Sequence, residues 1–214
     1  MTGPVFPFRS RVLPVVVLTD PAQAVPLAHA LLEGGIDVME ITLRHTAGLA
    51  GIEAVADTVP QMHVGAGTIT TRGEITRVCD AGARFGVSPG LTAELHQAAR
   101  DAGLPFMPGV MTPSEVMQAL QWGYGTVKLF PASQAGGLSM VKALAGPLGH
   151  VRLCPTGGVS PENLNDYLSQ PNVAMVGGSW LTPVDLIETA QWSAITRLAT
   201  EASAIDRALR SGDF

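Results

Sequence analysis

The chain has 214 residues, of which 46% are hydrophobic and 14% are charged, and its formal net charge is −5. This apolar composition excludes a disordered chain, and the negative charge argues against nucleic acid as the main partner. The longest early apolar run, Val12 to Leu18, is interrupted by Pro14 and is far too short to span a membrane. Because no signal-peptide pattern stands out either, we expect a cytoplasmic protein without membrane contact.

Short apolar runs alternate with helical stretches along the whole chain. Residues 1–11 are expected to form a short N-terminal arm or a cap below the fold, and residues 183–211 a closing helical segment. Ala22–Glu33 and Pro113–Trp122 are typical of the helices between. The predicted strands are Val12–Thr19, Asp37–Leu43, His63–Gly67, Arg84–Ser88, Pro105–Gly109, Thr126–Phe130, Val151–Cys154 and Val173–Gly177.

Alternating strands and helices predict either a closed parallel barrel or a doubly wound sheet. The count of eight strands favours the barrel, and the first strand–helix turn carries no glycine-rich dinucleotide fingerprint. No linker or composition break divides residues 1–214. We therefore predict an α/β protein with a single (β/α)8 TIM-barrel domain, whose functional residues lie at the C-terminal ends of the strands.

Lysine is rare in this chain, which has 11 arginines but only Lys128 and Lys142. Lys142 lies in a mixed stretch that predicts a surface helix. Lys128 lies inside the apolar run Thr126–Phe130, where burial of a charge is costly. A lysine at such a position is a candidate functional residue.

The second strand places a carboxylate where it can meet that lysine. Because side chains alternate along a strand, Glu40 and Arg44 share the inward face, about 13 Å apart, with Glu40 deeper and Arg44 at the rim. The same alternation turns Lys128 and Phe130 inward. Lys128 and Glu40 are therefore expected to point into one interior.

These three residues fit imine chemistry on a keto acid. A lysine must be unprotonated to attack a carbonyl, and burial and a nearby cation such as Arg44 both favour the neutral amine. Glu40 would pass protons as the general acid/base, and Arg44 offers a planar fork for a carboxylate. The alternative is a buried Lys–Glu ion pair without chemistry.

Glycine-rich turns follow several of the predicted strands. Strand three ends in a Gly-Ala-Gly-Thr68 turn, whose hydroxyl either binds a substrate oxygen or caps a helix, and strand four ends near Pro89. Backbone N–H groups of Gly-Gly turns can wrap an anion, so the last two strands predict a phosphate site unless these are plain tight turns. Its candidate residues are Thr156, Gly157, Gly158, Gly177, Gly178 and Ser179.

The histidines and cysteines give little indication of a functional site. The five histidines show no ligand spacing, so we predict no metal, and His45 is expected to be a solvated loop residue at the barrel mouth. Cys79 and Cys154 lie in apolar contexts and are predicted to be reduced core thiols.

The runs GGIDVMEITLR, VGAGT, VSPGL, PGVMTPSE, VKLFPA, CPTGGVSPEN and VGGSWL occur in this order between about Val12 and Leu181. Together they resemble the 2-keto-3-deoxy-6-phosphogluconate aldolase family, whose members are often also active on 4-hydroxy-2-oxoglutarate.

The resemblance implies a homotrimeric class I (Schiff-base) aldolase of the Entner–Doudoroff pathway, a lyase without metal or cofactor. Lys128 would be the imine nucleophile and Glu40 the general acid/base. Arg44, Thr68 and Pro89 would bind the pyruvyl carboxylate and keto group. The Gly-Gly loops would bind the phosphate. The substrate would be a small keto acid, cleaved to pyruvate and glyceraldehyde 3-phosphate, or to pyruvate and glyoxylate.

One departure is visible, because His45 stands where members commonly carry threonine directly after the strand-two arginine. It leaves the role of His45 and the preference among phosphorylated gluconate and galactonate keto-deoxy acids and 4-hydroxy-2-oxoglutarate open. A phosphosugar isomerase, a phosphate-transfer synthase or a non-catalytic phosphometabolite-binding protein remain the alternatives.

Overall fold

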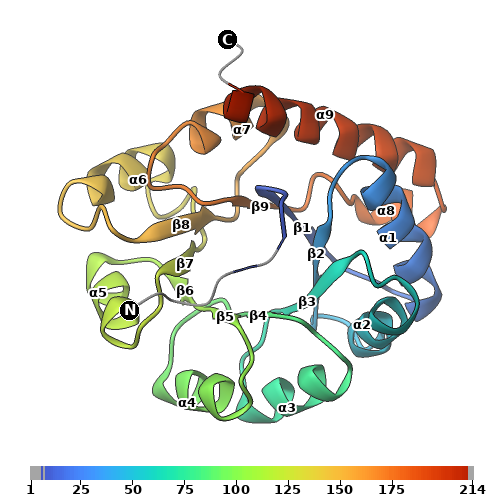
Figure 1. Cartoon of the computed structure of the whole chain (residues 1–214), viewed down its shortest axis with the longest axis horizontal. Coiled ribbons are helices and arrows are strands. Elements are labelled where there is room, and N and C mark those ends of the chain that lie inside the picture. The colour runs from blue at the N-terminus through green and yellow to red at the C-terminus, as the bar shows by residue number, and fades with distance from the viewer. Residues whose placement is uncertain (1–5, 7, 212–214) are drawn as a thin grey trace.

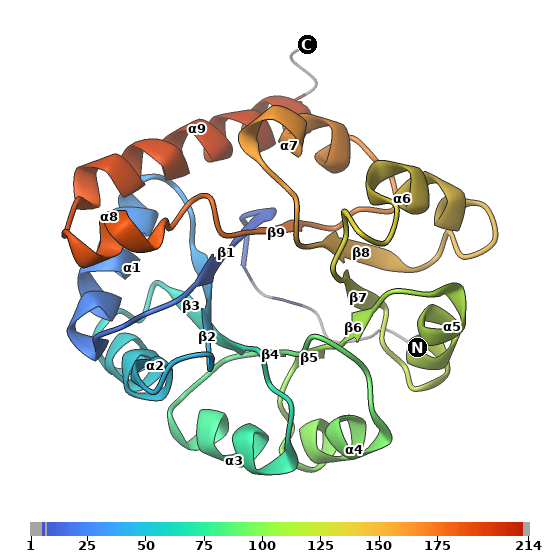
Figure 2. The same ribbon diagram turned by 180° about the vertical axis from the view of Figure 1, so that it is seen from behind.

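The computed structural model describes residue 6 and residues 8–211. Parallel strands form an inner ring and helices form an outer ring around it, as the two opposite views show (Figure 1, Figure 2). The predicted (β/α)8 barrel is thereby confirmed. None of the helices in the described part combines the length and the apolar composition that a membrane crossing requires.

The elements follow one another in the expected alternation. The strands are β1 (Val12–Val16), β2 (Val38–Thr42), β3 (His63–Gly67), β4 (Gly86–Val87), β5 (Phe106–Met107), β6 (Gly109–Val110), β7 (Thr126–Leu129), β8 (Arg152–Pro155) and β9 (Val176–Gly178). The helices are a 3-10 turn (Pro21–Gln23), α1 (Ala24–Glu33), α2 (Ala47–Thr58), α3 (Arg72–Asp80), α4 (Ala93–Asp101), α5 (Pro113–Gln121), α6 (Gly137–Ala145), α7 (Pro161–Leu168), α8 (Val184–Glu188) and α9 (Trp192–Ser211).

The parallel strands close into a ring through two short connections. One sheet has the order β5-β4-β3-β2-β1-β9 and the other the order β6-β7-β8. Single bridges from Leu153 to Val173 and from Thr156 to Gly177 join β8 to the β9 segment. On the other side, β5 continues directly into β6. The ring therefore brings the C-terminal ends of all the strands to one end of the barrel.

The prediction of one continuous fifth strand over Pro105–Gly109 was wrong. Phe106–Met107 pairs with β4, whereas Gly109–Val110 pairs with β7, and Pro108 lies between them. Proline has no N–H to donate to a ladder, so it is a natural point for the strand to change partners.

The C-terminal segment 183–211 consists of two helices, α8 and α9. The break lies between α8 and α9, where Ala190 adopts a left-handed backbone with φ of 53°. α9 then packs along α1 and α7 and completes the outer ring (Figure 1).

Threonines at the strand–helix turns fix where three of the helices begin. Thr71, Thr92 and Thr112 each accept a hydrogen bond from a backbone N–H in the first turn of α3, α4 and α5. Such caps satisfy N–H groups that have no partner within the helix. They anchor these turns at the C-terminal end of the barrel.

The described residues of the N-terminal segment, 6 and 8–11, lie at the opposite end of the barrel, beside the start of β2. Phe8 packs on Phe85, with ring centroids 5.7 Å apart. The carboxylate of Asp37, just before β2, accepts hydrogen bonds from the backbone N–H groups of Arg9 (3.0 Å) and Ser10 (3.0 Å). The arm is therefore held by both apolar contacts and a buried carboxylate.

We predict that Asp37→Asn destabilises the protein at neutral pH. Burial raises the pKa of Asp37, but the hydrogen bonds from Ser10 and Arg9 outweigh it, and the pKa lies below its usual value. The ionised carboxylate therefore contributes stability above the unfolded-state pKa, and this contribution is lost as the pH falls through the lower folded-state pKa. We expect a loss of about 1–3 kcal/mol at neutral pH, measured by urea unfolding at fixed protein concentration.

The difference from wild type should shrink below about pH 4, where the wild-type carboxylate also becomes protonated. Asp166→Asn, at an exposed position on α7, is the matched control and should change little. A difference that stays constant through the acid range would contradict this role of Asp37.

Candidate active site

Lys128 and Glu40 form a buried ion pair inside the barrel. The Lys128 Nζ lies 3.3 Å from Glu40 Oε1, and the two side chains are 4% and 1% exposed. Their strand neighbours Met39, Ile41, Val127 and Leu129 are fully buried. The inward placement predicted from strand alternation is confirmed for both residues of the pair.

Glycine makes room for the carboxylate of Glu40. Gly67 lies beside it on β3, and a Cβ on Gly67 would come within 2.1 Å of Glu40 Oε1. The second oxygen, Oε2, is buried and has no hydrogen-bond partner among the described residues. One carboxylate oxygen therefore holds the lysine while the other is free to exchange a proton with a third group.

Cys154 is the side-by-side neighbour of Lys128 on β8. Its thiol is fully buried, and burial raises its pKa to about 12 even though Lys128 lies nearby. The thiol therefore remains protonated and is a poor nucleophile. Both cysteines are free, as predicted, although Cys79 is only partly buried.

A cavity of about 280 Å³ opens above the ion pair at the C-terminal end of the barrel. Phe130 lines it, and the Lys128 Nζ lies 5.1 Å from the centre of that ring. Seven predicted site residues from the C-terminal ends of three strands line the same cavity: Arg44, Thr156, Gly157, Gly158, Gly177, Gly178 and Ser179. The structure thus brings together the predicted carboxylate-binding arginine and both predicted phosphate loops.

The glycines of these loops fit their positions for specific steric reasons. Gly157 and Gly158 have φ of 93° and 85°, which L side chains rarely adopt. A Cβ on Gly177 would lie 2.3 Å from Thr156 Oγ1, and a Cβ on Gly178 would collide with the ring of Trp180. The loops can therefore approach a ligand with bare backbone, as an anion site requires.

A helix begins directly after the first glycine loop, as predicted. α7 starts at Pro161, and the Asn163 side chain accepts a hydrogen bond of 2.9 Å from the Ser160 N–H. The N-terminal end of a helix carries partial positive charge. This end therefore adds to the favourable field for an anion at Gly157 and Gly158.

Thr68 and Pro89 do not line the cavity above the ion pair. Thr68 directly follows β3, is half-buried, and has an unusual backbone for a β-branched residue, with φ of 61°. Pro89 is exposed, and its main chain packs so tightly on Gly109 that a Cβ there would come within 2.3 Å. Both residues lie at the C-terminal ends of strands, on the side of the ring formed by β3 to β6.

His45 is exposed, as expected, and its Nδ1 accepts a hydrogen bond of 3.2 Å from the Ala47 N–H at the start of α2. Together with Arg44, Glu74 and Arg77 it lines a second cavity of about 210 Å³ beside the first. Lys142 is exposed on α6, as predicted. Among the described residues, no three histidine, cysteine or acidic side chains gather closely enough to hold a metal ion.

Three apolar residues of the cavity wall are not among the predicted site residues, namely Val15, Phe130 and Val159. Phe130 was placed on the inward face with Lys128, so the alternation carried its signal. Val15 and Val159 are ordinary buried residues whose position at the cavity follows from the closure of the ring and could not be seen in the pattern.

Comparisons with known proteins show which family this chain resembles. The family model described as KDPG and KHG aldolase matches residues 8–198. A 2-dehydro-3-deoxy-phosphogluconate aldolase of Pseudoalteromonas atlantica is 47% identical, over 92% of this chain and 91% of that protein. A KHG/KDPG aldolase of Escherichia coli K12 is 44% identical, over 94% and 91%.

A solved structure is similar along nearly the same length. It is a KDPG aldolase from Legionella pneumophila with pyruvate captured as a covalent carbinolamine intermediate, 45% identical, with a TM-score of 0.88 over 90% of this chain and 94% of that chain.

Proposed function

This chain belongs to the KDPG and KHG aldolase family, and we propose that it is a class I aldolase that cleaves 2-keto-3-deoxy-6-phosphogluconate to pyruvate and glyceraldehyde 3-phosphate. The observation that carries the proposal is the buried Lys128–Glu40 pair, 3.3 Å apart, below a cavity lined by an arginine and two glycine loops. The activity on 4-hydroxy-2-oxoglutarate, to give pyruvate and glyoxylate, is proposed as a second reaction of the same site.

Lys128 acts as the nucleophile. Its neutral amine attacks the C2 carbonyl carbon, and the resulting carbinolamine loses water to form an imine. The C4 hydroxyl then gives up its proton, the C3–C4 bond breaks, and its electron pair moves into the imine to form an enamine. The enamine takes a proton at C3, and water releases pyruvate and restores the amine.

Glu40 moves the protons of this sequence. It accepts a proton from the positively charged nitrogen that forms when the amine adds to the carbonyl, gives one to the departing hydroxyl of the carbinolamine, and takes one from the C4 hydroxyl through water. Its free Oε2 oxygen supports this role, because Oε1 already faces the lysine.

Arg44, Thr68 and Pro89 bind the pyruvyl end of the substrate. Arg44 holds the carboxylate through its planar fork, and the Thr68 hydroxyl and the Pro89 backbone turn contact the carboxylate or keto oxygens. The position of Arg44 on the cavity wall supports this assignment. The phosphate binds at the other side, against Thr156, Gly157, Gly158, Gly177, Gly178 and Ser179.

The whole chain works as one domain in a homotrimer in the cytoplasm, as a step of the Entner–Doudoroff pathway, without metal or cofactor. A charged share of 14%, against about 25% in typical proteins, supports an oligomer because it leaves few charges for a fully wetted surface.

We predict that pyruvate and borohydride place a reduced three-carbon adduct on Lys128. The chain has only one other lysine, the exposed Lys142, so peptide mapping by mass spectrometry gives a clear answer. Lys128→Ala should lose both the adduct and the retro-aldol activity, and Lys142→Ala should keep both. Near-ultraviolet circular dichroism checks that Lys128→Ala remains folded.

An unmodified Lys128 at every pyruvate concentration would rule out the imine mechanism. Retained activity in Lys128→Arg would favour an isomerase or phosphate-transfer enzyme. Ligand-induced stabilisation without any turnover would favour a binding protein.

We predict that Glu40→Gln lowers the turnover rate about 100-fold, because a glutamine cannot exchange protons. The rate of borohydride trapping with pyruvate should fall less than the rate of turnover, since cleavage needs more proton transfers than imine formation. The two rates are measured on the same preparation. Full turnover in Glu40→Gln would show that the acid/base group lies elsewhere.

We predict that Ser179→Asp raises KM for the phosphorylated substrate about tenfold or more, because it brings a negative charge to the phosphate loops. KM for 4-hydroxy-2-oxoglutarate, which has no phosphate, should change little. Ser179→Asn is the neutral control, and Ser179 is exposed, so the fold tolerates the change. Equal effects on both substrates would place the phosphate elsewhere.

A further inference from the structure

A third cavity lies at the opposite end of the barrel from the catalytic pair. Its volume is about 670 Å³, within the range of small-molecule sites. Two segments supply most of its wall: Gly103–Phe106, which leads into β5, and Trp122–Tyr124, which leads towards β7. Because both segments enter the N-terminal ends of strands, a ligand there cannot contact Lys128.

Aromatic side chains form a large part of the wall. The Trp122 ring stacks on the His96 ring, with centroids 4.7 Å apart and planes 18° apart. Tyr124 meets His96 edge-on, and Phe106 packs beside Tyr124. Leu104 adds an aliphatic contact to the same wall. Such a wall suits a flat apolar ring.

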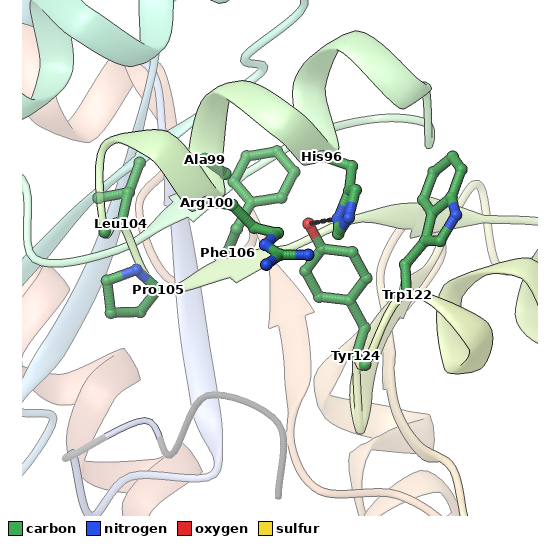
Figure 3. Close-up of a pocket in the computed structure, with 10 residues that line it drawn as sticks. His96, Ala99, Arg100, Leu104, Pro105, Phe106, Trp122 and Tyr124 are labelled. Carbon is green, nitrogen blue, oxygen red and sulfur yellow. Dashed lines mark hydrogen bonds between the residues drawn. The ribbon is translucent and has the colours of Figure 1, made fainter. Parts of the chain in front are cut away.

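Arg100 provides the charge of the cavity. Figure 3 shows its side chain extending from α4 into the cavity, towards Tyr124. Within the described residues, no carboxylate forms a salt bridge with Arg100. Its guanidinium group therefore has its hydrogen-bonding fork free for an anion.

The other polar groups leave this positive charge uncompensated. The Tyr124 hydroxyl lies 3.0 Å from His96 Nδ1, as the dashed line in Figure 3 marks. Burial raises the pKa of Tyr124 to about 12, although Arg100 opposes it, so the hydroxyl keeps its proton. Burial and Arg100 both lower the pKa of His96, which favours the neutral ring. Arg100 is thus the ionised group of the wall at neutral pH.

We propose that this cavity is a second ligand site, which binds a planar aromatic carboxylate with its carboxylate on Arg100 and its ring against the aromatic wall. The size of the cavity, the free guanidinium group and the apolar surface around it support this class of ligand. A neutral aromatic compound would make no ionic contact with the exposed Arg100, and a small anion such as phosphate would leave the apolar wall in water.

The test is calorimetric titration of the full-length protein with 1-naphthoate, compared with the neutral 1-naphthamide. We expect 1-naphthoate to bind about tenfold more tightly than the amide, and Arg100→Gln to raise its Kd about tenfold, as the loss of a charge-assisted contact requires. Arg197→Gln, at an exposed arginine on α9, is the matched control and should leave Kd unchanged.

A second control separates the two ends of the barrel. Arg44→Gln removes the carboxylate-binding arginine of the catalytic end and should also leave Kd unchanged. The proposal is wrong if neither probe binds, if acid and amide bind equally, or if Arg44→Gln rather than Arg100→Gln weakens binding. None of these outcomes depends on whether Lys128 forms an imine.

Discussion

The buried pair of Lys128 and Glu40 is the contact on which the rest of the site depends. Burying two charges costs several kcal/mol for each ion, and only close geometry with fully satisfied hydrogen bonds offsets that cost. Here the single contact is 3.3 Å long, which is longer than a strong ammonium–carboxylate bond, and Glu40 Oε2 has no partner in the described structure. This geometry offsets little of the cost of burying the two charges, so the pair is not explained by a contribution to stability. The same geometry leaves the lysine and one carboxylate oxygen available for reaction, which favours the catalytic interpretation over the structural one.

Sequence pattern predicted the parts of the fold and site that follow from periodicity. Alternation along strands placed Lys128 and Glu40 in one interior, and the positions of glycine pairs located the two loops that meet at the cavity.

The sequence pattern did not predict features that depend on which strands pair with one another around the ring. Pro108 looked like part of one strand, but its missing N–H lets the chain pair with β4 before it and β7 after it. The positions of Val15 and Val159 in the cavity wall could not be predicted either. A buried valine gives the same sequence pattern whether it packs against a helix or lines a ligand cavity. Thr68 and Pro89 were placed at the correct end of the barrel, but periodicity carries no information on which residues share one cavity.

The N-terminal end of the barrel contains stabilising contacts, whereas the C-terminal end contains the candidate active site. At the N-terminal end the arm is fixed by the Asp37 carboxylate and by the packing of Phe8 on Phe85, and these contacts are partly buried. At the C-terminal end the described structure contains an unpartnered carboxylate oxygen, a threonine with positive φ, and loops whose glycines leave backbone uncovered. Unsatisfied or strained groups cost free energy, so they persist only where the surrounding fold holds them. The capped helices α3, α4 and α5 provide that support, because each begins at the end where the strained residues lie.

Most of the basic side chains in this chain are arginines, so few amines other than that of Lys128 could form an imine with a substrate. Arginine remains protonated in proteins and cannot act as a nucleophile, whereas lysine can lose its proton when it is buried. The chain has 11 arginines and two lysines, so most of its positive charges come from side chains that cannot attack the carbonyl carbon of a substrate. Lys142 is exposed on α6 and does not line the cavity, and the Cys154 thiol next to Lys128 is kept protonated by burial. The Lys128 amine is therefore the reactive group of the site both because of its own buried position and because arginine side chains and the protonated Cys154 thiol are poor nucleophiles.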